Sequence, residues 1–104
     1  MTVEGVKLGI LGGGQLGRMT IQAGMNFNLS ISILDPDKNA PCKSIADEFE
    51  VGLLDDFDTV YAFGKKVDLM TIEIEHVNVG ALEKLEREGV KVYPQSHVIK
   101  TIQD

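Results

Sequence analysis

Short apolar runs alternate with amphipathic stretches along the whole chain. The runs contain few polar residues, which is typical of parallel strands that are buried on both faces of a sheet. Turn-forming residues separate the runs from the amphipathic stretches. The pattern predicts five strands, at about residues 6–11, 29–34, 48–54, 68–74 and 90–93.

Apolar residues at helical spacing predict helices at 15–27, 56–65 and 78–88, and a last one that starts near Ser96. Asp55 or Asp56 is placed to cap the second helix, Asn78 caps the third, and Gly89 ends it. Residues 38–46 are expected to form a loop or a single turn. The inner faces of the second and third helices are predicted to carry Phe57, Val60 and Tyr61, and Val79, Leu82 and Leu85.

This βαβαβαβ order predicts an α/β fold with right-handed crossovers. We expect one Rossmann-like domain over residues 1–104, a doubly wound sheet of about five mostly parallel strands. The sequence stops inside a predicted helix. Residues from about 96 to 104 are therefore expected to begin a connection to a further domain.

Composition narrows the class of protein. With 104 residues, 43% of them hydrophobic and 25% charged, the chain resembles an ordinary globular domain. Its net charge of −6 argues against nucleic acid or an anionic membrane as the main partner. Cys42 is the only cysteine, so no internal disulfide forms. No signal peptide or membrane-spanning stretch is evident, and a cytoplasmic location is expected.

The first predicted strand runs directly into a glycine turn in which Gly12, Gly14 and Gly17 have the spacing G-x-G-x-x-G. Such a turn lets a ligand approach the backbone, and the helix that follows directs free N–H groups at it. Arg18 is unfavourable in that first helical turn unless a bound anion offsets the helix dipole, although a surface arginine is the alternative. Gln15 offers an amide for ribose or phosphate oxygens.

An acidic segment follows the fourth predicted strand. With a period of two, Thr71, Glu73 and Glu75 point to one side, at the sheet edge where open α/β sheets bind ligands. Glu73 is placed to accept a hydrogen bond from an amine or hydroxyl of a ligand whose phosphate lies on the glycine turn. Solvated loop acids are the alternative. His76 is expected in a loop, and no metal site or catalytic nucleophile is predicted.

Asp35 allows two interpretations that remain open. An acid at the end of the second strand is where a nicotinamide-dinucleotide site binds ribose, which favours a dehydrogenase. The sequence Asp35-Pro36-Asp37 is equally a turn.

Three stretches together resemble the amino-terminal domain of the N(5)-carboxyaminoimidazole ribonucleotide synthetases, the ATPase subunits of phosphoribosylaminoimidazole carboxylase in purine biosynthesis. They are Gly9-Ile-Leu-Gly-Gly-Gly-Gln-Leu-Gly-Arg-Met19, then Leu34-Asp-Pro-Asp37 with Ala46-Asp-Glu48, and Thr71-Ile-Glu-Ile-Glu-His-Val77. The family often has asparagine at the position of His76, with a proline soon after. This departure concerns the shape of the loop more than its chemistry.

The resemblance implies a part of an ATP-dependent carboxylating ligase that acts on aminoimidazole ribonucleotide and bicarbonate. An ATP-grasp domain, absent from this sequence, would bind Mg-ATP, and the amino-terminal domain would hold the ribonucleotide. The isolated chain is expected to bind no cofactor and to have no synthetase activity; a homodimer stays open. The implied ribonucleotide-binding residues are Gly14, Gln15, Leu16, Gly17, Arg18, Glu73 and Glu75.

Other functions remain as alternatives. An NAD(P)-binding domain of a dehydrogenase or ligand-gated transporter would use Asp35. Relatives that transform glycinamide ribonucleotide share the glycine turn and the acid at Glu73. A non-catalytic interaction module would use the glycine turn only for packing.

Overall fold

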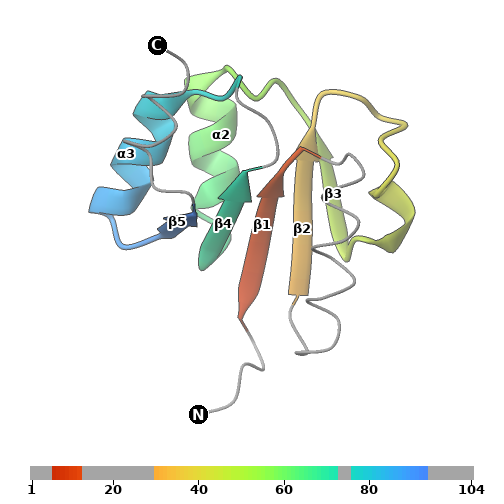
Figure 1. Cartoon of the computed structure of the whole chain (residues 1–104), viewed down its shortest axis with the longest axis horizontal. Coiled ribbons are helices and arrows are strands. Elements are labelled where there is room, and N and C mark those ends of the chain that lie inside the picture. Colours follow the sequence, from red (N-terminus) through yellow and green to blue (C-terminus); the bar gives the residue numbers. More distant parts are fainter. Residues whose placement is uncertain (1–5, 13–29, 73–75, 94–104) are drawn as a thin grey trace.

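A five-stranded sheet forms the centre of the molecule, as the computed structural model shows for residues 6–12, 30–72 and 76–93 (Figure 1). All pairings are parallel, in the order β3-β2-β1-β4-β5. This confirms the predicted α/β fold and its five parallel strands, although the third ends at Val51, three residues before its predicted end. The strands are β1 (Lys7–Leu11), β2 (Ser30–Asp35), β3 (Glu48–Val51), β4 (Leu69–Ile72) and β5 (Lys91–Tyr93).

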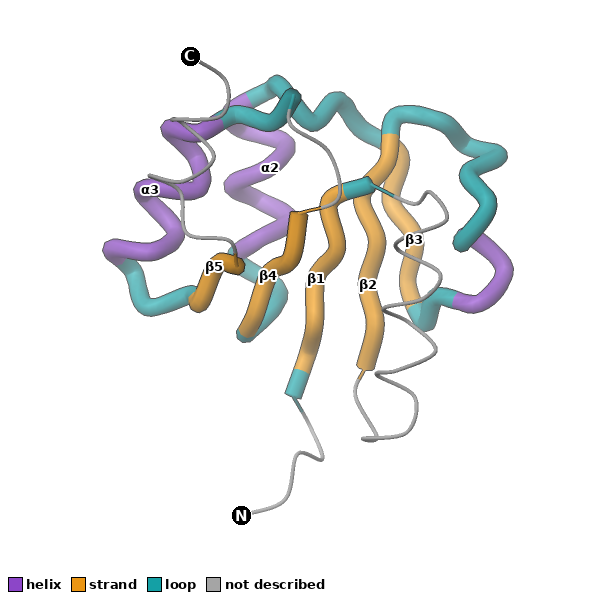
Figure 2. The backbone as a smooth tube through the Cα atoms, in the orientation of Figure 1, coloured by secondary structure: helices purple, strands orange, loops and turns teal. Residues whose placement is uncertain are grey.

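Two helices, α2 (Phe57–Gly64) and α3 (Val79–Arg87), lie side by side on one face of the sheet (Figure 2). A 3-10 turn, η1 (Lys43–Ile45), interrupts the loop between β2 and β3. Each helix begins at a predicted cap, because Asp56 accepts a hydrogen bond from the Thr59 N–H and Asn78 from the Ala81 N–H. Gly89 follows α3 with a φ of 101°. The helices predicted at 15–27 and from Ser96 lie outside the described residues.

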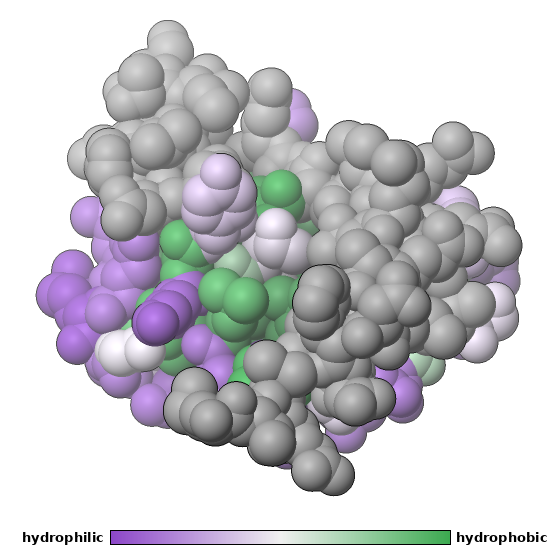
Figure 3. Space-filling view, turned by 60° about the horizontal axis from the view of Figure 1, so that its bottom comes forward, coloured by the Kyte–Doolittle hydropathy of each residue, from purple (hydrophilic) through white to green (hydrophobic). Residues whose placement is uncertain are grey.

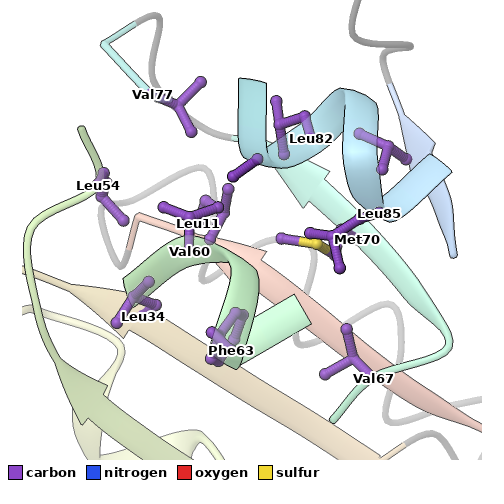
Figure 4. Packing of buried hydrophobic residues seen from close by; sticks show 12 residues of the cluster. Leu11, Leu34, Leu54, Val60, Phe63, Val67, Met70, Val77, Leu82 and Leu85 are labelled. Atoms are coloured by element: carbon purple, nitrogen blue, oxygen red, sulfur yellow. The ribbon is translucent and has the colours of Figure 1, made fainter. Parts of the chain in front are cut away.

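The sheet separates two hydrophobic clusters, as the predicted burial of both faces requires. The larger cluster lies between the sheet and the two helices (Figure 4). The smaller one lies on the opposite face. Along each of the strands β1 and β2, consecutive residues belong to opposite clusters because side chains alternate between the two faces of a sheet. The larger cluster includes Leu11, Leu34, Val60, Phe63, Met70, Leu82 and Leu85, and the smaller Leu8, Ile10, Ile31, Ile33 and Cys42. Among the described residues visible in Figure 3, apolar residues lie near the centre and hydrophilic ones to their left.

The inner face of α2 differs from the prediction at one position. Phe57 keeps 37% of its surface exposed and stacks on Tyr61, with ring centroids 5.9 Å apart. The buried aromatic residue is Phe63, which is 1% exposed and follows Val60 by three positions. Leu54, in the loop before the helix, belongs to the core cluster. The apolar face of α2 is therefore shifted toward its carboxyl end, and Phe57 is left at the surface.

Candidate functional site

The carboxyl ends of β1 and β4 meet at the centre of the sheet. The chain passes outward from β1 to β2 and β3, and then returns to the other side of β1 with β4 and β5. Leu11 at the end of β1 pairs with Ile72 at the end of β4. Open α/β sheets bind ligands at this kind of reversal, outside the carboxyl ends of the strands. The predicted glycine turn and acidic segment continue from these two paired residues.

Gly12 is the first residue of the glycine turn and lies within the described part. Its φ is 106°, a conformation that favours glycine, and its N–H donates to the Leu34 carbonyl oxygen at 2.8 Å. The chain therefore turns directly after β1, as the G-x-G-x-x-G spacing predicts. Gly14, Gln15, Leu16, Gly17 and Arg18 lie outside the described residues, and their roles stay predictions.

The acidic segment is described only at its two ends. β4 is described as far as Ile72, so Glu73 and Glu75 lie outside the described residues and stay predictions. His76 is exposed, as expected for a loop residue. Val77 returns to the core with 4% exposure. The acidic segment is thus bounded by a paired strand on one side and a buried valine on the other.

Asn78 fixes the far end of this segment through three hydrogen bonds. Its Oδ1 caps α3 at the Ala81 N–H, 2.9 Å away. Its Nδ2 donates to the Asp55 carbonyl oxygen at 3.1 Å, and its backbone N–H donates to the Leu54 carbonyl oxygen at 2.8 Å. The sequence predicts only the cap, because the other two contacts join loops that are more than twenty residues apart. Asn78 therefore ties the loop after β4 to the loop after β3.

Asp35 supports the turn interpretation. One carboxylate oxygen accepts a hydrogen bond from the Asp37 N–H at 2.8 Å, and Asp37 in turn accepts from the Asn39 N–H at 2.8 Å. Side chains that bond the backbone two residues onward are typical of Asx turns. This geometry accounts for the Asp35-Pro36-Asp37 sequence without a ribose ligand.

Asp47, part of the Ala46-Asp-Glu48 motif, has a structural contact at the opposite edge of the sheet. Its Oδ2 accepts from the Ile31 N–H at 2.7 Å, and its own N–H donates to the Ile31 carbonyl oxygen at 2.9 Å. Asp68 makes the same pair of bonds with Lys7, at 2.9 and 2.8 Å. Each aspartate stands just before a strand and fixes the start of the neighbouring one. Sequence reasoning missed both roles because the partners are distant along the chain.

The clearest electrostatic cluster lies on α2 and the end of α3. Glu88 accepts hydrogen bonds from Lys65 Nζ at 2.9 Å and from the Tyr61 hydroxyl at 2.7 Å. These bonds hold the pKa of Glu88 below its usual value and raise the pKa values of Tyr61 and Lys65. Shifted pKa values also arise in structural ion pairs, and this group joins two helices at the surface.

The described residues contain neither a metal-binding cluster nor a membrane-spanning helix. Within 6–12, 30–72 and 76–93, no three His, Cys, Asp or Glu side chains are grouped so that they could hold a metal ion. None of the helices in those ranges is long and apolar enough to cross a membrane.

Comparison with known proteins identifies the family. The model of the ribonucleotide synthetase preATP-grasp domain matches residues 5–103. The chain belongs to this family. The phosphoribosylaminoimidazole carboxylase of Vigna aconitifolia, a chloroplastic protein, is 43% identical over 99 residues, which are 95% of this chain and 18% of that protein. The chain thus spans about a fifth of the length of the curated relatives it matches.

Solved structures agree with this assignment to the preATP-grasp family. The N5-carboxyaminoimidazole ribonucleotide synthetase of Thermotoga maritima is 35% identical, with a TM-score of 0.89 over 95% of this chain and 28% of its own. The Aspergillus clavatus synthase, solved with ADP and 5-aminoimidazole ribonucleotide, is 40% identical, with a TM-score of 0.82 over 95% of this chain and 26% of its own. A glycinamide transformylase from Mycobacterium tuberculosis, 21% identical with a TM-score of 0.85, shares the fold.

Proposed function

We propose that this chain is the ribonucleotide-binding part of an ATP-dependent carboxylating ligase of purine biosynthesis. The substrate is aminoimidazole ribonucleotide, which the ligase converts, with bicarbonate and ATP, to the N-carboxy product. The pairing of Leu11 with Ile72 carries the proposal, because the glycine turn and the acidic segment continue from these neighbouring strand ends. A structure 40% identical to this chain was solved with the same ribonucleotide.

The proposed site divides into an anionic and a polar end. The phosphate and ribose lie against the glycine turn, where backbone N–H groups and a helix N-terminus attract an anion. Gly14, Gln15, Leu16, Gly17 and Arg18 make this part of the site. Glu73 and Glu75 accept hydrogen bonds from the amine or hydroxyl groups at the other end of the ligand.

This chain contributes binding, and an ATP-grasp domain contributes the chemistry. When bound, Mg-ATP supplies the phosphoryl group that activates bicarbonate, and the residues that hold it belong to the ATP-grasp domain. The chain alone is therefore inactive as a synthetase. Its proposed place of action is the cytoplasm. An ATPase assay that shows ribonucleotide-dependent turnover by the pure chain would contradict this division of roles.

The test is an amide NMR titration of the labelled chain with aminoimidazole ribonucleotide and, separately, with NAD. We expect saturable shifts at Gly12–Arg18 and around Glu73 with the ribonucleotide alone. A site that is completed by another domain binds weakly, at about millimolar affinity or roughly 4 kcal/mol. Glu73→Gln should weaken binding, whereas Glu86→Gln, on α3 near the end of that helix, should leave it unchanged.

Two results would overturn the proposal. Saturable NAD shifts that reach Asp35, without shifts from the ribonucleotide, indicate a dinucleotide-binding domain. Ribonucleotide shifts spread evenly over the surface, and equal in Glu73→Gln, indicate non-specific binding of an anion.

A further inference from the structure

Asn78 makes one more hydrogen bond than the cap of a helix requires. Its Oδ1 accepts from the Ala81 N–H and thereby caps α3. Its Nδ2 donates to the Asp55 carbonyl oxygen at 3.1 Å, in the loop between β3 and α2. A side-chain amide has an oxygen that accepts and a separate nitrogen that donates, so it serves both partners at once. The bond to Asp55 is not part of the cap and has a role of its own.

The cap of the neighbouring helix cannot make such a bond. Asp56 caps α2, which also follows a parallel strand, but an ionised carboxylate has no donor. It accepts from the Thr59 N–H at 2.9 Å and from the Thr59 hydroxyl at 2.6 Å, both within the first turn of α2. A cap alone is therefore sufficient after β3, at the edge of the sheet. The additional bond occurs after β4, the strand that ends beside the start of the glycine turn.

Fixed residues stand on both sides of the acidic segment. On one side, Ile72 is paired in the sheet. On the other side, Val77 is buried in the core cluster with 4% exposure, and the Asn78 N–H donates to the Leu54 carbonyl oxygen at 2.8 Å. Only residues 73–76 separate these two anchors. The position of the second anchor therefore limits where the acidic side chains can lie.

The end of β2 holds both the glycine turn and the loop to which Asn78 is bonded. The Leu34 carbonyl oxygen accepts from the Gly12 N–H at 2.8 Å, at the start of the glycine turn. The next carbonyl oxygen, that of Asp35, accepts from the Gly52 N–H at 3.1 Å, at the start of the loop after β3. Through one of its own carbonyl oxygens, this loop in turn holds the Asn78 amide. The amide thus helps to set the spacing between the two halves of the proposed site.

We propose that Asn78 is a positioning residue for the ribonucleotide. Its side-chain amide holds the acidic segment at a fixed spacing from the glycine turn, so that Glu73 meets the polar end of a ligand whose phosphate lies on that turn. The inference rests on the proposed function, because Asn78 acts through a residue that the proposed function assigns to the site. A binding group that is already held in place loses less conformational entropy when the ligand binds. Asn78 therefore raises affinity without contacting the ligand.

The experiment compares Asn78→Ser with the wild type by amide NMR of the labelled chain. Serine keeps an oxygen that caps α3, lacks the amide that bonds Asp55 and adds no charge. We expect the variant to bind the ribonucleotide about fivefold more weakly, the cost of ordering one further side chain. Without ligand, the backbone order parameters of residues 73–76 should fall, whereas those of β1 should not change.

A double-mutant cycle identifies the residue through which Asn78 acts. In a Glu73→Gln background, Asn78→Ser should weaken binding by less than about twofold, because the group that it positions is already lost. Thr59→Val is the matched control. It removes the hydroxyl that donates to Asp56 and so disturbs the start of α2 without a change of charge. This control should alter neither ribonucleotide affinity nor the order parameters of residues 73–76.

Equal affinity of Asn78→Ser and the wild type overturns the inference. A loss of the same size in the Glu73→Gln background, or in Thr59→Val, also overturns it, because Asn78 then does not act through Glu73. If the wild type binds no ribonucleotide while the order parameters fall in Asn78→Ser, the proposed function is wrong and the restraint by Asn78 is supported. Should Asn78→Ser not fold, Asn78→Asp, which also keeps a capping oxygen, replaces it and is judged by the order parameters.

Discussion

Gly64 of α2 lies so close to Leu85 of α3 that a methyl group on residue 64 would overlap the Leu85 side chain. The same methyl group would lie 3.0 Å from the Met70 sulfur atom. Leu85 and Met70 are both fully buried in the core cluster. The missing side chain of Gly64 therefore allows α2 and α3 to pack against each other and against β4.

The packing predicts a coupled response to two substitutions. Gly64→Ala overfills the core at a cost of about 1–3 kcal/mol, against a gain of about 1 kcal/mol in helix propensity. Leu85→Ala leaves a cavity and costs about 2–5 kcal/mol. In the double variant the new methyl group enters part of that cavity, so urea unfolding should show a loss smaller than the sum. Strictly additive losses would contradict the close approach.

Two substitutions of Asn78 distinguish its capping of α3 from its hydrogen bond to the loop after β3. Asn78→Ala removes both and should cost about 1–2 kcal/mol. Asn78→Asp keeps an oxygen that can cap α3 but has no amide to donate to the Asp55 carbonyl, so it should cost less. Urea unfolding gives the free energies, and hydrogen exchange at Ala81 reports the cap. Equal losses in both variants would show that the cap contributes little.

Local signals predicted much of the fold. The caps at Asp56 and Asn78 and the stop at Gly89 depend on residues within one helical turn, and each occurs where the sequence places it. The parallel sheet follows from apolar runs joined by helices. The roles of Asp47 and Asp68 could not be predicted, because their partners are 16 and 61 residues away.

Less of the candidate site than of the fold could be predicted from local signals in the sequence. The turn predicted after β1 is observed at Gly12, and Leu11 at the end of β1 pairs with Ile72. The exposure of Phe57 was missed because helical periodicity marks a face of α2 and gives no information on where the sheet beneath it ends. The residues proposed to touch the ribonucleotide depend on the motif and the family.

We expect loss of the Asp47 carboxylate to destabilise the start of β2, where it accepts a hydrogen bond from the Ile31 N–H. Asp47→Ala leaves the Ile31 N–H, which is partly buried, without this acceptor, and should cost about 1–3 kcal/mol. Asp47→Asn retains an acceptor oxygen and should recover most of that loss. Chemical denaturation measures the cost, and amide exchange should accelerate at Ile31 in the alanine variant. Ribonucleotide binding at the opposite edge should not change; a selective loss of binding would instead place Asp47 in the ligand site.

The Glu88 cluster predicts how stability depends on pH. The pKa of Glu88 is lowered in the folded chain by Lys65 and Tyr61, so its contribution is present above the usual value of 4.5 and is lost as pH falls through the folded value. The pKa values of Tyr61 and Lys65 are raised, so their contributions are present below 10.0 and 10.5 and are lost as pH rises through the folded values. The difference in unfolding free energy between the wild type and Glu88→Gln should therefore be constant between these limits and shrink beyond them. Glu83→Gln, on the same helix, serves as the control. A difference that is independent of pH would show that Glu88 acts through packing alone.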